Sequence, residues 1–102
     1  MVHSFIENKL PELSFIFKKH KIKKAYVFGS ACTDAFDDAS DVDFLIEPDD
    51  EADPIIKGEN LWDLYYDLKG LLGRDVDMIT RDSLTNKYFI SEINRTSVPI
   101  YG

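Results

Sequence analysis

Three aspartates and a Gly-Ser pair in this chain could together carry phosphate chemistry. Gly29 and Ser30 follow the apolar run 25–28, and ten residues later Asp41 and Asp43 open a second apolar run. Both runs are short and rich in β-forming residues, so each is predicted to be a buried strand. A Gly-Ser turn can bring backbone N–H groups and a hydroxyl to a phosphate. With carboxylates beside it, this pattern indicates metal-assisted transfer on a nucleoside triphosphate.

The spacing of the two aspartates places both on one face of their strand. Residues i and i+2 share a face, and their Cα atoms lie about 7 Å apart, so Asp41 and Asp43 can lean together over a cation. The alternative is that they are ordinary polar residues on a solvent-facing side. Aspartate is depleted in strands, however, and two like charges on one face repel each other unless a cation lies between them.

A third acid strengthens the metal hypothesis. Asp77 lies between Val76 and Met78 on another apolar run, and it can complete a cluster with the first two aspartates if the two strands are neighbours. Mg²⁺ prefers hard carboxylate oxygens. Asp75 would point to the same side of the strand as Asp77, but it follows Arg74 at the start of the strand. A local ion pair or a turn is the better interpretation of Asp75.

The elements that must position these residues can be predicted from periodicity, caps and turn residues. We predict helices near 4–20, with a restart at Pro11, and at 59–73 and 82–94; strands at 24–28, 41–47, 75–80 and 98–101; and a polar surface loop at 48–58. Helices and strands alternate without a regular βαβ series. The predicted fold class is therefore α+β, a small mixed sheet covered by helices, in one domain spanning residues 1–102.

Composition narrows the choice of partners. The net charge is −7, from 12 basic and 19 acidic residues, which disfavours direct binding of DNA or RNA and suits a basic protein partner. One cysteine excludes an internal disulfide. The N-terminal residues mix charges with apolar side chains, unlike a signal peptide, and no apolar run is long enough to span a membrane. A cytoplasmic protein without membrane contact is expected.

Two aromatic residues fall outside the leucine stripe of the predicted helix 59–73. Trp62 and Tyr66 are four residues apart, so they share a helix face. We predict that they lie at the rim of the core. The alternative is a partner surface, because Trp and Tyr are common anchors of protein interfaces.

The spacing of Gly29-Ser30, Asp41-x-Asp43 and Asp77 resembles the nucleotidyltransferase superfamily that shares a palm with DNA polymerase β. The short length, the turn at 71–74 and the closing segment 98–102 are more similar to its smallest members. These are the minimal nucleotidyltransferases, antitoxins that act beside HEPN-domain RNase toxins. The resemblance spans nearly the whole chain and implies the palm-like fold.

The resemblance also implies roles for the motif residues. Gly29 and Ser30 would hold the terminal phosphates of ATP, and Asp41 and Asp43 would ligate the Mg²⁺ that carries the triphosphate. Together with Asp77 they would hold a second Mg²⁺. Similar family members transfer AMP to a tyrosine of the HEPN toxin, so ATP and a HEPN-type toxin are the expected partners. Either a homo-oligomer or a hetero-oligomer is compatible with the sequence.

One feature departs from the family pattern. The family commonly has a basic residue between the Gly-Ser pair and the aspartates, whereas residues 31–40 contain three aspartates and no base. Arg74, Arg81 or a partner's arginine could compensate. A catalytically silent antitoxin that neutralises its partner by contact alone is therefore the alternative function. Transfer to a small molecule, as in aminoglycoside-modifying relatives, is disfavoured because no second domain exists to bind the acceptor.

Overall fold

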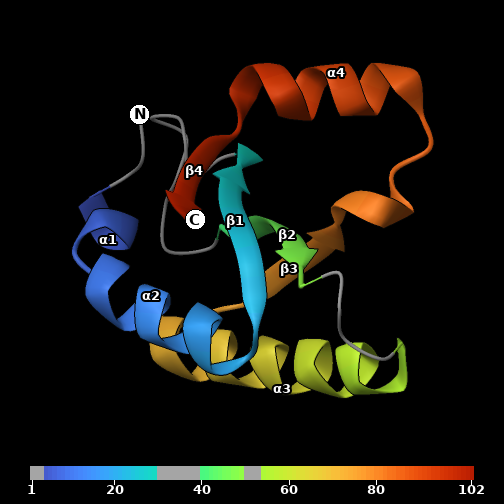
Figure 1. Cartoon of the computed structure of the whole chain (residues 1–102). Helices are drawn as coiled ribbons and strands as arrows, with labels where there is room; N and C mark the ends of the chain where they lie inside the picture. The colour runs from blue at the N-terminus through green and yellow to red at the C-terminus, as the bar shows by residue number, and fades with distance from the viewer. Residues whose placement is uncertain (1–3, 30–39, 50–53) are drawn as a thin grey trace.

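Four strands form one mixed sheet in the computed structural model, which describes residues 4–29, 40–49 and 54–102. Figure 1 shows the sheet between helices, with α4 on the opposite side from α2 and α3. In chain order the elements are α1 (Ser4–Glu7), α2 (Leu10–Lys19), β1 (Ile22–Phe28), β2 (Val42–Pro48), α3 (Pro54–Leu72), β3 (Val76–Thr80), a 3₁₀ turn (Arg81–Ser83), α4 (Lys87–Thr96) and β4 (Val98–Tyr101).

The strand order is β3-β2-β1-β4. β1 pairs antiparallel with both β2 and β4, whereas β2 and β3 are parallel. Parallel neighbours need a crossover connection, and α3 lies in the segment between them. The predicted α+β fold with a small mixed sheet and covering helices is therefore confirmed.

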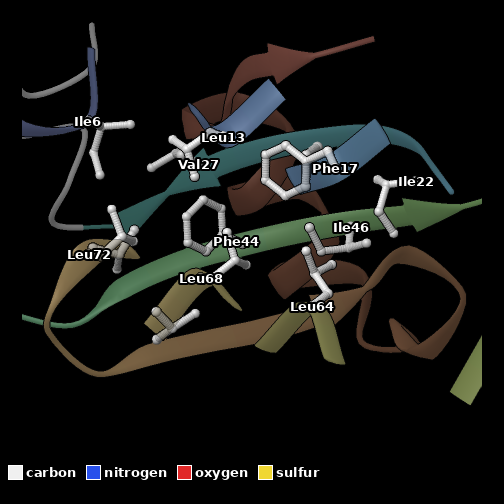
Figure 2. Close-up of a cluster of buried hydrophobic side chains, with 13 residues drawn as sticks. Ile6, Leu13, Phe17, Ile22, Val27, Phe44, Ile46, Leu64, Leu68 and Leu72 are labelled. Atoms are coloured by element: carbon white, nitrogen blue, oxygen red, sulfur yellow. The ribbon is translucent and has the colours of Figure 1, made fainter. Parts of the chain in front are cut away.

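The main core lies on the sheet face that α1, α2 and α3 cover. Alternate residues of β2 point into it, and Phe44 packs edge-on against Phe17 of α2 with ring centroids 6.0 Å apart. Figure 2 shows this cluster. Its buried members are Ile6, Leu13, Phe17, Ile22, Ala25, Val27, Val42, Phe44, Ile46, Leu64, Leu68, Leu72 and Val76.

The opposite face carries a smaller cluster beneath α4. Phe28, Leu45 and Ile93 are its buried members, with Tyr26, Ile79 and Leu84 packed against them. Leu45 and Phe44 are neighbours on β2 and point to opposite faces, as strand geometry requires. Asp43 is two residues before Leu45 in β2, so its side chain points to the same face of the sheet, the one that α4 covers.

Two helix boundaries differ from the prediction. Helix α3 begins at Pro54, so the second half of the predicted loop 48–58 is helical; proline is well suited to a first helical turn, where its missing N–H costs nothing. The last helix begins at Lys87 rather than near residue 82. Its N-cap is Asn86, whose side-chain oxygen accepts hydrogen bonds from the N–H groups of Tyr88 and Phe89. The restart at Pro11 is confirmed.

The prediction for the two aromatic residues of α3 is wrong. Trp62 is 65% exposed and Tyr66 is 58% exposed, so neither lies at the rim of the core. The reason is angular: the inward stripe of α3 is formed by Leu64, Leu68 and Leu72, and Trp62 and Tyr66 occupy the outer side. No helix within the described ranges is long and apolar enough to cross a membrane.

Candidate active site

Asp43 and Asp77 lie side by side on neighbouring strands. In the parallel pairing of β2 with β3, Asp43 is the register partner of Asp77. Adjacent strands are about 4.8 Å apart, and register partners point to the same side of the sheet. Val42, Phe44 and Val76 are buried on the opposite side. The strand adjacency that the acidic-cluster hypothesis requires is therefore present.

Asp41 completes an electrostatically coupled group. It precedes β2 by one residue and is exposed, whereas Asp43 is half-buried. Burial raises the pKa of Asp43, and the negative charges of Asp77 and then Asp41 raise it further. Asp43 therefore lies within reach of the charges of Asp77 and Asp41.

Gly29 lies directly against the Asp43 carboxylate. The antiparallel register pairs Phe28 with Asp43, so the residue after β1 arrives beside that side chain. Gly29 has φ +72°, and a Cβ built on it would collide with Asp43 Oδ2 and lie 3.4 Å from Cγ. Glycine is needed here for both the backbone conformation and the close approach. Ser30, the predicted phosphate ligand beside it, lies outside the described residues.

Arg81 lies away from the acidic group. Its Nε donates to Glu47 Oε2 at 3.1 Å, and its Nη1 donates to Asn94 Oδ1 at 3.1 Å. Glu47 is four residues along β2 from Asp43, a separation of about 13 Å in a strand. Arg81 therefore fastens α4 to the far end of the sheet and does not reach the acids.

Arg74 lies at the same end of the sheet as the acids. Its Nη1 donates to the carbonyl oxygen of Ser40 at 3.2 Å, and its guanidinium carbon lies 4.4 Å from the centre of the Phe5 ring. Ser40 directly precedes Asp41, so Arg74 fixes the chain where it enters the acidic pair. The sequence shows no sign of these contacts, because their partners are 34 or more residues away.

Mg²⁺ suits the donor chemistry of this site. Within the described part of the chain, no three His, Cys, Asp or Glu side chains already converge to hold a metal ion. Mg²⁺ usually keeps several waters and binds through one or two carboxylates together with substrate phosphates, so a ready-made cage is not required. The carboxylates of Asp41, Asp43 and Asp77 are hard oxygen donors of the kind that Mg²⁺ takes, and a bound cation would offset the repulsion that raises the pKa of Asp43.

Comparison with known proteins gives a family match and two related sequences. The family model described as polymerase beta, nucleotidyltransferase matches residues 12–102. Two proteins of Methanocaldococcus jannaschii, named protein adenylyltransferase MJ0435 and MJ1217, are each 35% identical to the chain. The first match covers 68% of this chain and 70% of the relative, and the second covers 81% of each.

Solved structures share the fold. A minimal nucleotidyltransferase superposes with a TM-score of 0.76 at 21% identity, over 97% of this chain and 96% of the other. A toxin–antitoxin complex with AMP-PNP gives a TM-score of 0.67 at 24% identity, covering 94% of this chain and 73% of the matched one. A tri-AMPylated HEPN toxin of Shewanella oneidensis in complex with its MNT antitoxin gives 0.64 at 19% identity, covering 94% and 71%.

Proposed function

Because this chain belongs to the polymerase β nucleotidyltransferase family, we propose that it transfers AMP from ATP to a hydroxyl group of a partner protein. The observation that carries this proposal is the pairing of Asp43 with Asp77 on the α4 face of the sheet, beside Gly29. The two archaeal relatives, both named protein adenylyltransferases, support a protein acceptor.

The chain's own residues would divide the work of binding. The backbone N–H at Gly29 and the Ser30 hydroxyl would hold the terminal phosphates. Asp41, Asp43 and Asp77 would hold two Mg²⁺ ions. Bound Mg²⁺ neutralises charge on the triphosphate and lowers the pKa of a coordinated hydroxyl. Arg74 keeps Ser40 and the start of β2 in place, so that the carboxylates do not have to reorganise during the reaction.

The transfer exchanges one P–O bond for another. The acceptor oxygen bonds to the α-phosphorus of ATP, the bond from that phosphorus to the β-phosphate oxygen breaks, and pyrophosphate leaves. Asp77 is exposed on β3, an edge strand of the sheet, and we assign its carboxylate as the group that receives the acceptor's proton. Positioning and electrostatics dominate such a reaction, so a small protein can perform it when its partner brings the acceptor.

The proposed acceptor is a tyrosine of a HEPN-type toxin, and the proposed biological role is that of an antitoxin. The fold neighbours include toxin–antitoxin complexes, one of them with an AMPylated HEPN toxin, which supports this choice. A cytoplasmic site of action follows from this role, since the ATP and the toxin would both be there. The second candidate is an antitoxin that acts by contact alone; the absence of a base in residues 31–40 favours it.

Label transfer tests the proposal. Purified chain is incubated with a source-cell lysate, Mg²⁺ and ATP labelled on the α-phosphate, beside the Asp43→Asn variant. Asp75→Asn is the matched control, because Asp75 is a neighbouring exposed aspartate whose carboxylate pairs with Lys69 at 3.5 Å. We expect one labelled protein with wild type and control, none with Asp43→Asn, and the label on a tyrosine. Absence of label from folded wild-type protein would favour the contact-only antitoxin.

A further inference from the structure

The outer side of α3 carries three aromatic rings in mutual contact. Trp62 stacks on Tyr65 with centroids 6.3 Å apart, and both meet Tyr66 edge-on at 5.5 Å. Trp62 and Tyr66 are mostly exposed. We call Trp62, Tyr65 and Tyr66 the α3 aromatic face. Trp and Tyr bury much apolar area at little cost in side-chain entropy, so clustered exposed rings of this kind are typical of binding surfaces.

Two glycines frame the α3 aromatic face. Gly58 lies one turn before Trp62, and Gly70 lies one turn after Tyr66. A Cβ at either position would meet no described atom within 4 Å, and neither glycine has a positive φ. Glycine inside a helix is destabilising relative to alanine. The packing of the described chain does not require them, so their use fits the close approach of a second helix, whose distance depends on the side chains at the contact.

Charge around this face selects the kind of partner. Glu59 and Asp63 are both exposed and flank Trp62 on the helix, whereas Lys69, one turn beyond Tyr65, lies 5.9 Å from the centre of the Tyr65 ring and pairs with Asp75. A second copy of the chain would bring the same two acids against them, and the net charge of −7 adds to that repulsion. An arginine or lysine from another protein can instead pair with these acids, and it can lie on the Trp62 ring.

The α3 aromatic face and the acidic group lie on opposite sides of the sheet. The inner stripe of α3 packs on the core that Phe44 enters, whereas Asp43 points to the α4 side. A protein seated on the outer side of α3 therefore leaves the acids open. Docking and transfer use separate surfaces.

From these observations we infer that the α3 aromatic face docks an α-helix of a different, basic protein, with small or apolar residues beside arginine or lysine. The inference goes beyond the proposed function, since it requires a stable contact at a surface distant from the acids and does not depend on AMP transfer.

Site-specific crosslinking in the source cell tests the inference. The photoreactive residue p-benzoylphenylalanine is placed at position 62, and in a matched strain at position 88, where Tyr88 is 89% exposed on α4. We expect position 62 to crosslink to a basic helix of another protein, identified by mass spectrometry of the crosslinked peptide, and position 88 not to reach that helix. A crosslink from position 62 to a second copy, or none, would overturn the inference.

The glycines give a second test with the partner so identified. Gly58→Ala and Gly70→Ala should raise the melting temperature of the free chain and weaken partner binding about tenfold or more. Equal or tighter binding in both variants would contradict close helix approach. Asp43→Asn should keep the position 62 crosslink. In the wild-type chain, a position 62 crosslink without label transfer would count against the proposed function alone, and label transfer without that crosslink against this inference alone.

Discussion

The two faces of the sheet differ in what they bury. The face under α1, α2 and α3 holds thirteen buried side chains of the described chain, and the α4 face holds three. The first face holds the larger cluster of buried apolar side chains, whereas the second combines a small apolar cluster with Asp43 and Asp77. Stability is therefore concentrated on one face, and this leaves the other able to tolerate charges that repel each other.

Substitution of two adjacent residues of β2 should give the largest difference in stability between the two faces of the sheet. Ile46 and Leu45 are isomeric, both fully buried and on opposite faces. We expect Ile46→Ala to cost about 4 kcal/mol of unfolding free energy and Leu45→Ala about 2 kcal/mol, because α4 can shift to fill the smaller cavity. Urea unfolding measures both values. A larger loss from Leu45→Ala would mean that the α4 face carries the stability.

Asp43→Asn should separate stability from activity. Burial, Asp77 and Asp41 raise the pKa of Asp43, so its charge opposes folding at neutral pH, and the neutral amide should raise the melting temperature. Transfer of AMP should fall by roughly 100-fold or more, since charge stabilisation by a bound cation is worth several kcal/mol. A thermal scan and a label assay on one preparation measure both. A lower melting temperature in Asp43→Asn than in wild type would contradict the proposed repulsion among the three carboxylates.

Gly29→Ala and Gly73→Ala form a matched pair. Both glycines have positive φ, so alanine should cost about 1–2 kcal/mol at either position. A Cβ at Gly29 also meets Asp43, whereas at Gly73 it meets no described atom within 4 Å. Only Gly29→Ala should therefore reduce transfer. If the two variants kept equal activity, the contact between Gly29 and Asp43 would have no role in the site.

The smallest expected effect concerns the free energy of unfolding at acid pH, and it involves a contact between α3 and the end of α2. Asp67 Oδ2 lies 2.6 Å from His20 Nε2, and this contact lowers the pKa of Asp67. A lowered pKa stabilises the folded state above the ordinary value of 3.8, and that stability is lost as pH falls through the folded-state value. Asp67 is 37% exposed, so solvent screening keeps the effect below about 1 kcal/mol.

Urea unfolding of wild type and Asp67→Asn at a series of pH values on either side of 3.8 measures this contribution. The wild type should lose more stability than Asp67→Asn as pH falls below 3.8. If both proteins lost the same free energy of unfolding as pH falls, the contact with His20 would not stabilise the fold.

The sequence predicted those features that depend on local pattern. Short apolar runs rich in β-forming residues located the strands, and the acids at Asp43 and Asp77 pointed to a site because aspartate is unfavourable in strands. The register that places Gly29 against Asp43 could not be predicted, since the ten residues between Ser30 and Asp41 in the sequence do not fix which strand residues pair. The start of α3 was missed because the polar, proline-containing segment before it has the composition of a loop.

Long-range contacts explain the remaining gaps. Arg74 and Arg81 were equivalent candidates in the sequence, and only the fold separates them, with Arg74 beside Ser40 and Arg81 held by Glu47. The exposure of Trp62 depended on which side of α3 meets the sheet. That side is chosen by packing of the whole leucine stripe, not by the aromatic residues themselves.

Paramagnetic mapping with Mn²⁺, a substitute for Mg²⁺, tests the central claim most directly. In the presence of a non-hydrolysable ATP analogue, amide signals of Gly29, Val42–Phe44 and Val76–Met78 should broaden, and those around the acids of α3, Glu59 and Asp63, should not. The broadening should disappear in Asp43→Asn and persist in Asp75→Asn. Broadening centred on α3, or unchanged in Asp43→Asn, would contradict a metal–nucleotide site on the α4 face.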